Sequence, residues 1–305
     1  MARVDILIPT TYPDGPPKAA DLSAFLRSAE DLGFGGLWVI DRLFHQTAVL
    51  DGFTTMVWAA ACTSRVRLGS AVLLMPFRNP ALLARQIATV DTLSGGRVTL
   101  GISLGGRENE HATVGATFRQ RARRLEEGIE VLRQLFTGAA VNFKGRFYEL
   151  ADATISPRPT QGAGLPILLG GGSDAGLARA GRIGDGWIAG GGGTPEQFAA
   201  NWRKVQAAAQ ASGRQTSGLQ NAKLFYMWVD DDVDLARAQV ERFVRAYYGP
   251  RYDINNAVFG PAEACAERLR AFAAAGCQTL ILGPAGLDPA QLETIQKRLV
   301  PLLVQ

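Results

Sequence analysis

Both histidines of the chain lie in two short polar segments, residues 41–45 and 105–111, each of which follows an apolar run. Histidine and glutamate are side chains that transfer protons near neutral pH. We therefore predict His45, Glu108 and His111 as candidate proton donors or acceptors of a catalytic site. The alternative for each is a structural or solvent-exposed role, which is common for a single loop histidine or glutamate.

Two glycine tracts form the second feature that could support chemistry. Residues 170–172 precede Ser173-Asp174 and residues 190–193 precede Thr194-Pro195, which are residue types that begin helices. The free N–H groups of a helix start bind anions, so two such starts predict a phosphate clamp formed by Gly170, Gly171, Gly172, Ser173, Gly190, Gly191 and Gly192. Neither tract matches the P-loop or the dinucleotide fingerprint. Tight strand-to-helix turns without a ligand are the alternative.

Residues 66–106 show most clearly which elements must position these segments. Residues 66–74 and 97–104 are continuous apolar runs, typical of parallel strands that are covered on both faces. Between them an apolar stripe at three-and-four spacing begins after Asn79-Pro80 and stops at residues 94–96, which predicts a helix. Small residues at the strand ends, Gly69-Ser70-Ala71 above all, leave room for a flat ligand.

Strand and helix patterns alternate along the whole chain. The predicted strands are residues 4–8, 37–40, 66–74, 98–103, 166–169, 186–189, 222–229 and 279–282. The predicted helices are residues 18–32, 52–63, 80–94, 119–137, 174–183, 195–212, 232–247, 261–275 and 288–303. These units predict an α/β fold, a single (β/α)₈ TIM barrel over residues 1–305 with its site at the C-terminal strand ends. Residues 138–165 are predicted to form an inserted β-hairpin that serves as a lid over the barrel mouth.

The composition excludes several classes of function. Hydrophobic residues make up 47% of the chain and charged residues 20%, as in ordinary soluble domains, and the first 15 residues hold too short an apolar run for a signal or membrane-spanning segment. We therefore expect a cytoplasmic protein without a membrane partner. The net charge is +4, but the basic run 119–124 is followed by glutamates on a helix and lacks aromatic residues, which argues against nucleic-acid binding. Three isolated cysteines predict free thiols and no metal site.

Five segments jointly resemble the luciferase-like superfamily of flavin- and deazaflavin-dependent oxidoreductases. They are GFGGLWVIDR (33–42), SRVRLGSAVL (64–73), RNPALLARQIATVDTLSGGRVTLGISLG (78–105), ISPRP (155–159) and GRIGDGWIAG (181–190). The resemblance implies a luciferase-like barrel with insertions, a cofactor ring against the third and fourth strand ends, and the cofactor phosphate at the two glycine tracts. Further cofactor-binding residues are then Asp41, Arg42, Ser70, Ala71, Gly105, Gly106 and Asn109. A non-prolyl cis peptide is implied at Ser70–Ala71 or its neighbour.

The cofactor that the resemblance implies is reduced coenzyme F420 or reduced FMN. Asn109-Glu110 resembles the F420-dependent branch, whereas Arg42 replaces the usual histidine of that branch and Gly106 replaces its glutamate. The lysine that sugar-phosphate dehydrogenases of this branch carry near the second glycine tract is absent from residues 190–194. A phosphorylated sugar is therefore not the expected substrate, and the apolar and aromatic composition favours a hydrophobic small molecule.

The sequence is consistent with more than one function. We expect F420-dependent hydride transfer slightly ahead of an FMN-dependent two-component monooxygenase, which would hydroxylate its substrate with oxygen and need a separate reductase. A catalytically silent flavin-binding relative and a non-redox barrel enzyme are also consistent with these residues. Because barrels of this superfamily often dimerise, a homo-oligomer is expected.

Overall fold

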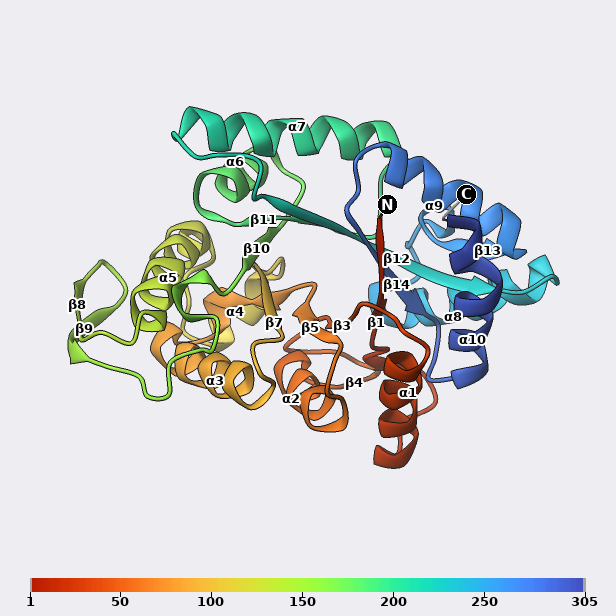
Figure 1. Cartoon of the computed structure of the whole chain (residues 1–305), viewed down its shortest axis with the longest axis horizontal. Helices are drawn as coiled ribbons and strands as arrows, with labels where there is room; N and C mark the ends of the chain where they lie inside the picture. Colours follow the sequence, from red (N-terminus) through yellow and green to blue (C-terminus); the bar gives the residue numbers. More distant parts are fainter. Residues whose placement is uncertain (1, 304–305) are drawn as a thin grey trace.

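A computed structural model describes residues 2–303 and contains a closed barrel of eight parallel strands surrounded by helices (Figure 1). The barrel strands are β1 (Arg3–Leu7), β3 (Gly36–Val39), β5 (Arg67–Ser70), β7 (Val98–Ser103), β10 (Ile167–Gly170), β11 (Gly186–Ala189), β12 (Gln220–Val229) and β14 (Thr279–Pro284). Each strand pairs with its neighbours in parallel, and the β7–β10 ladder, with Gly101 opposite Leu168, completes the ring. The predicted (β/α)₈ TIM barrel and its eight strands are thus confirmed.

Short additional strands decorate the barrel. β6 (Leu73–Leu74) continues the third strand position beside β7, and β13 (Val258–Gly260) pairs with the end of β12. β2 (Thr11–Tyr12) and β4 (Ala48–Val49) form a small antiparallel pair. These pieces lengthen the barrel wall around the C-terminal strand ends.

The helices follow the predicted apolar stripes. They are α1 (Ala19–Asp31), α2 (Gly52–Cys62), α3 (Pro80–Leu93), α4 (Glu108–Thr113), α5 (Arg121–Phe136), α6 (Asp174–Ile183), α7 (Pro195–Ala211), α8 (Val233–Tyr248), α9 (Ala262–Ala274) and α10 (Pro289–Thr294). The expected caps are present: Asn79 accepts the N–H groups of Ala81 and Leu82, and Thr194 forms a capping box with Gln197. None of the described helices is both long and apolar enough to cross a lipid bilayer.

Two helical segments differ from the prediction. The last helix does not run evenly to residue 303, because α10 gives way to a π-helical turn at Ile295–Leu299 and a 3₁₀ turn at Val300–Leu303. Pro301 explains the change, since it has no N–H for an α-helical bond and its ring crowds the preceding turn. The short helix α4 was missed by the periodicity, because its six residues are too few to show an apolar stripe.

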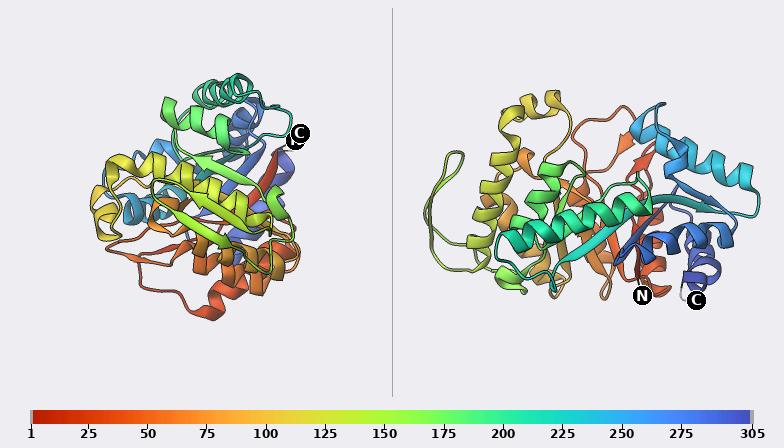
Figure 2. Two further views of the ribbon diagram at one scale, coloured as in Figure 1. Left: turned by 90° about the vertical axis from the view of Figure 1, so that its left-hand side faces the viewer. Right: turned by 90° about the horizontal axis from the view of Figure 1, so that it is seen from above.

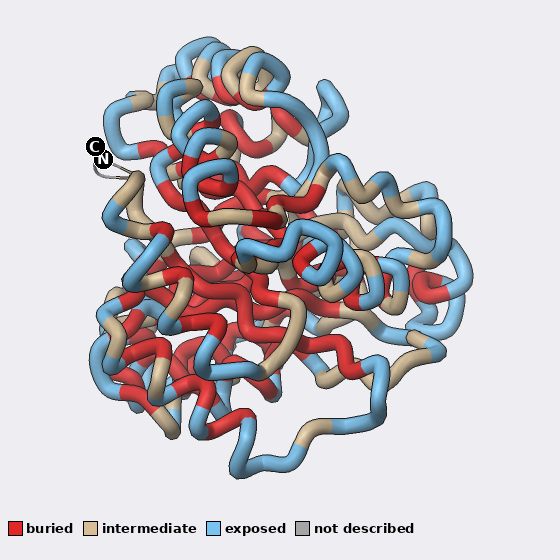
Figure 3. Tube along the Cα trace, turned by 90° about the vertical axis from the view of Figure 1, so that its right-hand side faces the viewer, coloured by how far each residue is buried: buried red, intermediate tan, exposed pale blue. Residues whose placement is uncertain are grey.

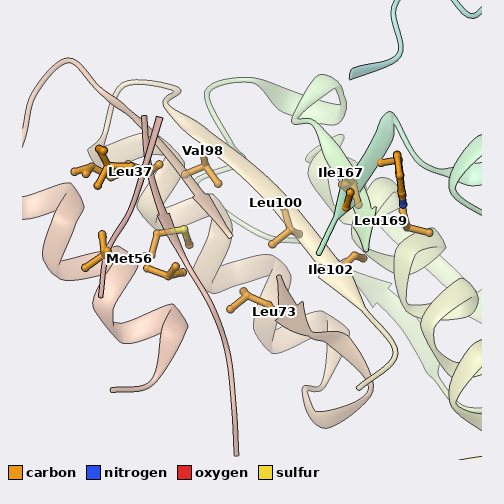
Figure 4. Close-up of a cluster of buried hydrophobic side chains, with 14 of the residues drawn as sticks. Leu37, Met56, Leu73, Val98, Leu100, Ile102, Ile167 and Leu169 are labelled. Carbon is orange, nitrogen blue, oxygen red and sulfur yellow. The ribbon is translucent and has the colours of Figure 1, made fainter. Parts of the chain in front are cut away.

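The core has two layers, one inside the barrel and one between the strands and the helices. The red parts of the tube in Figure 3 mark the buried residues at the centre of the molecule. Successive side chains of β3 point to opposite faces of the strand and so enter different core layers. Leu37 points outward to Met56 of α2 in the close-up of Figure 4, whereas Trp38 fills the barrel interior. An ideal Cβ on Gly69 would lie 2.3 Å from Cε3 of Trp38, so a glycine is required there. Packing on both faces accounts for the continuously apolar strand sequences.

The inserted segment contains an antiparallel hairpin of β8 (Val141–Lys144) and β9 (Glu149–Ala153). Glu127 of α5 accepts the N–H groups of residues 146–148 at its turn, with distances of 2.8–3.1 Å between nitrogen and oxygen. The hairpin consequently lies along the outer side of α5 (Figure 2, right). Gln161, which follows the hairpin in the chain, lies at the N-terminal strand ends, where its side-chain amide donates to the carbonyl of Val98. The expectation of a lid over the barrel mouth is therefore wrong for this segment.

Candidate cofactor site at the barrel mouth

The C-terminal strand ends bring the predicted ring-binding segments together. Val39 lies opposite Ser70 across the β3–β5 ladder, and an ideal Cβ on Gly170 would lie 3.0 Å from Val72. The Ala71–Val72 peptide bond is cis, so the implied non-prolyl cis bond is present at the neighbour of Ser70–Ala71. The second, third and fifth strands thus meet around one half-buried backbone segment.

Ser70 connects strands and does not present its side chain to the mouth. Its hydroxyl is fully buried, donates to the carbonyl of Gly101 at 2.7 Å and accepts the Gly101 N–H at 3.0 Å. Both functions of the hydroxyl are therefore used within the barrel wall. Ala71, which follows it, is half-buried and remains at the surface of the mouth.

Asp41 forms an ion pair that the sequence did not reveal. Its Oδ2 accepts the Leu74 N–H and an Nη2 bond from Arg78, both at 3.0 Å, and Arg78 also contacts Asp51 at 3.1 Å. Burial alone would lower the pKa of Arg78, but the two carboxylates outweigh it and raise that pKa. Asp41 therefore holds the segment after the cis peptide in place through the Leu74 N–H and Arg78.

Arg42 and Glu110 each have a buried polar atom that meets no hydrogen-bond partner in the described part of the chain. The guanidinium of Arg42 lies 5.0 Å from the ring centre of Tyr247, and its buried Nε meets no hydrogen-bond partner within residues 2–303. Glu110 is fully buried, accepts the Phe44 N–H at 3.4 Å through Oε1 and leaves Oε2 without a partner in the described chain. Buried polar atoms are almost always satisfied, so these two point to a group that the protein alone does not supply.

His45 is engaged by backbone groups on both sides of its ring. Nδ1 accepts the Thr47 N–H at 3.1 Å, so the proton of the neutral ring is on Nε2, which donates to the carbonyl of Tyr247 at 2.8 Å. The ring also stacks on Tyr247 with 5.3 Å between centroids. This arrangement suits a residue that joins the 41–47 loop to the end of α8.

The remaining predicted site residues follow β7, and they differ in how far they are buried. Glu108 and Asn109 are exposed in the first turn of α4, next to Gly106, which has open space where a Cβ would lie. His111 is fully buried between Phe77 and Phe118, and its Nε2 would lie 3.3 Å from a Cβ on Gly105. Burial lowers the pKa of His111, although the carbonyls of the 104–105 turn oppose the shift. A neutral His111 thus packs behind the Gly105 turn, which has φ of +71°.

The first glycine tract leads into α6 in the predicted way. The Ser173 hydroxyl accepts the Gly176 N–H at 3.2 Å, and the indole of Trp187 donates to the carbonyl of Gly171 at 2.6 Å. A Cβ on Gly171 or Gly172 would meet no atom within 4 Å. The tract therefore presents open backbone to the mouth.

The second glycine tract is held by a residue that sequence reasoning missed. Nζ of Lys223, in β12, donates to the carbonyls of Gly190 and Gly192 at 2.7 and 2.8 Å. The two tracts and Lys223 line a cavity of about 280 Å³ together with residues of α7. A single lysine within an apolar strand carries no local signal of this position.

Tyrosines form one wall of the mouth beside this tract. The hydroxyl of Tyr226, in the C-terminal half of β12, lies 2.8 Å from that of Tyr248, and Tyr248 stacks on Tyr252 with 5.2 Å between centroids. A Cβ on Gly191 would lie 3.7 Å from the Tyr252 hydroxyl, which is buried and has no partner in the described part of the chain. Burial raises the pKa of Tyr252 to about 12, so the hydroxyl stays protonated. The wall is aromatic with one unused hydroxyl near the glycine backbone.

A family model for luciferase-like monooxygenases matches residues 3–257. The chain belongs to the luciferase-like monooxygenase family. Among its curated relatives is an F420-dependent glucose-6-phosphate dehydrogenase of Kineococcus radiotolerans, 40% identical over 182 residues, or 57% of this chain and 52% of the relative. The pyrimidine monooxygenase RutA of Escherichia coli is 34% identical over 203 residues, or 64% of this chain and 54% of the relative. The matches span about half the length of these luciferase-like relatives.

The luciferase-like architecture extends over the full chain. An F420-dependent secondary alcohol dehydrogenase, solved with an F420-acetone adduct, superposes with a TM-score of 0.87 and covers 99% of each chain at 20% identity. At this identity the likeness shows the shared fold. The relatives that match include F420-dependent dehydrogenases and a monooxygenase.

The residues at the mouth fit a tricyclic cofactor with a phosphate. Gly106, Gly171, Gly172 and Gly190 all have open space in place of a side chain, so backbone can approach a flat ring and an anion closely. The unsatisfied Nε of Arg42 and hydroxyl of Tyr252 are donors without acceptors in the described residues. Both would gain an acceptor from a ligand that carries carbonyl or phosphate oxygens.

Proposed function

We propose that the chain catalyses reversible hydride transfer between coenzyme F420 and a hydrophobic small molecule. The observation that carries the choice of F420 is the 40% identity to an F420-dependent dehydrogenase. The open glycine backbone at the strand ends supports a flat cofactor, and the wall of Tyr226, Tyr248 and Tyr252 supports an apolar substrate opposite it.

When bound, F420 supplies the hydride donor or acceptor. The chain's own residues then have three tasks: to orient the two reactants, to exclude water and to move one proton. The Ala71–Val72 segment and the Gly105 turn limit the positions open to the ring, and His111 supports that turn from behind. The tyrosine wall covers the substrate side and keeps water away from it.

Glu108 is the proton partner in this proposal. His45 has both ring nitrogens engaged by backbone, and His111 is enclosed behind the Gly105 turn, whereas Glu108 is exposed beside the open position at Gly106. A carboxylate can accept the proton of an alcohol as its hydride leaves and return it in the reverse direction. The guanidinium of Arg42 is assigned to anionic oxygens of the ligand.

The second candidate function is an FMN-dependent monooxygenase, because RutA is also a relative at 34% identity. This function would use reduced flavin from a separate reductase and would consume oxygen. The same cradle and aromatic wall would serve it. The two candidates differ in cofactor preference and in whether turnover requires oxygen.

Anaerobic turnover with reduced F420 tests the preferred function. The purified chain is mixed with F420H₂ and a panel of hydrophobic ketones, enones and imines, and the visible absorbance of oxidised F420 is followed. We expect turnover without oxygen for part of the panel and none with the oxidised F420 and glucose 6-phosphate pair. Turnover that requires oxygen would favour the monooxygenase instead.

Glu108→Gln tests the assigned proton partner within the same assay. General acid–base catalysis contributes roughly 10²–10⁴-fold, so kcat/KM should fall by that order while the F420 dissociation constant stays unchanged. Glu130→Gln, at an exposed position of α5, is the matched control. Wild-type kcat/KM in the Glu108 variant would remove that residue from the mechanism.

A further inference from the structure

Lys223 is buried beneath the second glycine tract without a negative partner. Its exposure is 1%, and no carboxylate oxygen of residues 2–303 lies within 4.0 Å of Nζ. Besides donating to the carbonyls of Gly190 and Gly192, the ammonium lies 5.0 and 4.9 Å from the ring centres of Phe225 and Phe272. Buried ammonium groups are normally paired, so a positive charge is left unbalanced at this cavity.

The two carbonyl bonds also orient the amides of the tract. In a trans peptide the C=O and the following N–H point in opposite directions, and the tract contains no cis bond. Drawing the carbonyls of Gly190 and Gly192 toward Lys223 therefore turns the N–H groups of Gly191 and Gly193 to the other side. The Gly193 N–H donates to Asn256 at 3.3 Å, while the Gly191 N–H finds no acceptor within the described residues.

We propose that Lys223 is a positioning residue of the anion site: it fixes the second glycine tract so that the Gly191 amide faces the cofactor phosphate, and its charge attracts that phosphate. This inference rests on the proposed use of a phosphate-bearing cofactor. It adds a determinant of cofactor affinity that lies outside the tract itself, on the neighbouring strand.

The groups around Lys223 make this site pH-dependent. Burial lowers the pKa of Lys223 to about 8; Cys277, from the segment before β14, opposes the shift, and Arg268 of α9 adds to it. The facing residues of α7, Gln197 and Asn201, are uncharged. The ammonium is thus mostly present at pH 7 and mostly lost at pH 9.

The test compares F420 with its phosphate-free deazaflavin riboside, which shares the ring, by fluorescence titration. The ratio of their affinities cancels ring ionisation and reports the phosphate together with the acidic tail attached to it, neither of which titrates between pH 7 and pH 9. For the wild-type chain the ratio should fall about tenfold between pH 7 and pH 9, because a group with a pKa near 8 loses most of its charge in that range. A ratio independent of pH would overturn the inference, and this measurement needs no variant.

Lys223→Met supplies the second arm. It should weaken F420 binding by tenfold or more at pH 7, leave riboside binding within twofold and remove the pH dependence of the ratio. Lys297→Met, which removes an exposed lysine paired with Glu293 near the C-terminal end of the chain, should match the wild type. Wild-type F420 affinity in Lys223→Met would overturn the inference.

A measurement of Tm in sulfate distinguishes failure of this inference from failure of the proposed function. If the wild type binds no phosphate-bearing cofactor, the proposed function fails, and the anion site is tested by the shift of Tm in sodium sulfate against sodium chloride at equal ionic strength. Sulfate stabilises folded proteins in general, so the site is reported by the part of the sulfate-induced rise of Tm at pH 7 that is lost at pH 9 and in Lys223→Met. A rise of Tm that is unchanged by pH and by the substitution would overturn the inference.

Discussion

Glu30 joins the last turn of α1 to the chain that enters β5, and its removal should destabilise the barrel without affecting the mouth. Its carboxylate accepts the N–H groups of Ser64, Arg65 and Val66, with nitrogen–oxygen distances of 2.6–3.0 Å. These bonds lie at the N-terminal end of the strand, opposite the cofactor site. In TIM barrels that end serves stability and the C-terminal end serves function.

The size of the effect follows from the pKa of Glu30. Burial alone would raise it, but the three backbone N–H groups outweigh burial and lower the pKa from 4.5 to about 2. At about 1.4 kcal/mol per unit, this shift corresponds to roughly 3 kcal/mol of unfolding free energy. Because the folded-state pKa is depressed, the contribution is fully present above about pH 4.5 and is lost as the pH falls toward 2.

The assay is denaturant unfolding of Glu30→Gln and the wild type from pH 7 to pH 2.5. We expect the variant to lose about 3 kcal/mol at pH 7, with the difference shrinking below pH 4.5, and to keep the wild-type affinity for F420. Asp31→Asn is the control, since its exposed pair with Arg65 is worth about 0–1 kcal/mol. A difference that stayed constant down to pH 2.5, or a loss below 1 kcal/mol at pH 7, would refute the reasoning.

Three further substitutions test the mouth. Arg78→Met leaves the buried carboxylate of Asp41 without its cation and should lower the unfolding free energy by about 3 kcal/mol in denaturant titrations; a loss below 1 kcal/mol would contradict the ion pair's role. Gly172→Val fills an open position of the cradle, so the F420 dissociation constant should rise tenfold or more in a fluorescence titration while Tm is kept, and an unchanged constant would count against the cradle. Tyr252→Phe removes a hydroxyl that has no partner among the described residues, so the unfolding free energy should not fall, whereas ligand affinity should drop severalfold; a loss of stability with unchanged affinity would contradict its assignment to the ligand.

The barrel was predictable from the sequence because its elements have strong local signals. Strands buried on both faces are continuously apolar, and helix starts such as Asn79-Pro80 and Thr194-Pro195 carry side chains whose caps the structure shows. The glycine tracts mark strand ends, and strand ends meet at one face of a parallel barrel. The position of the mouth followed from these facts, whereas the expectation of a flavin or F420 came from the resemblance to the luciferase-like superfamily.

Partners distant in the chain could not be predicted in the same way. Arg78 reaches Asp41 across 37 positions, and His45 meets the carbonyl of Tyr247 across 202 positions. Lys223 sits in an apolar strand, where only the three-dimensional position of the second glycine tract explains its burial. The inserted hairpin was recognisable from its alternating residues, but its side of the barrel depends on Glu127 of α5 and has no sequence signal of its own.

Paired equilibrium titrations of the purified chain with F420 and with FMN test the central claim most directly. Fluorescence of each cofactor is read at equal ionic strength and at pH 7, where Lys223 is mostly charged. Hydride transfer by F420 predicts a micromolar or tighter dissociation constant for F420 and at least tenfold weaker binding of FMN. Tighter binding of FMN than of F420 would contradict the claim and assign the barrel mouth to a flavin monooxygenase.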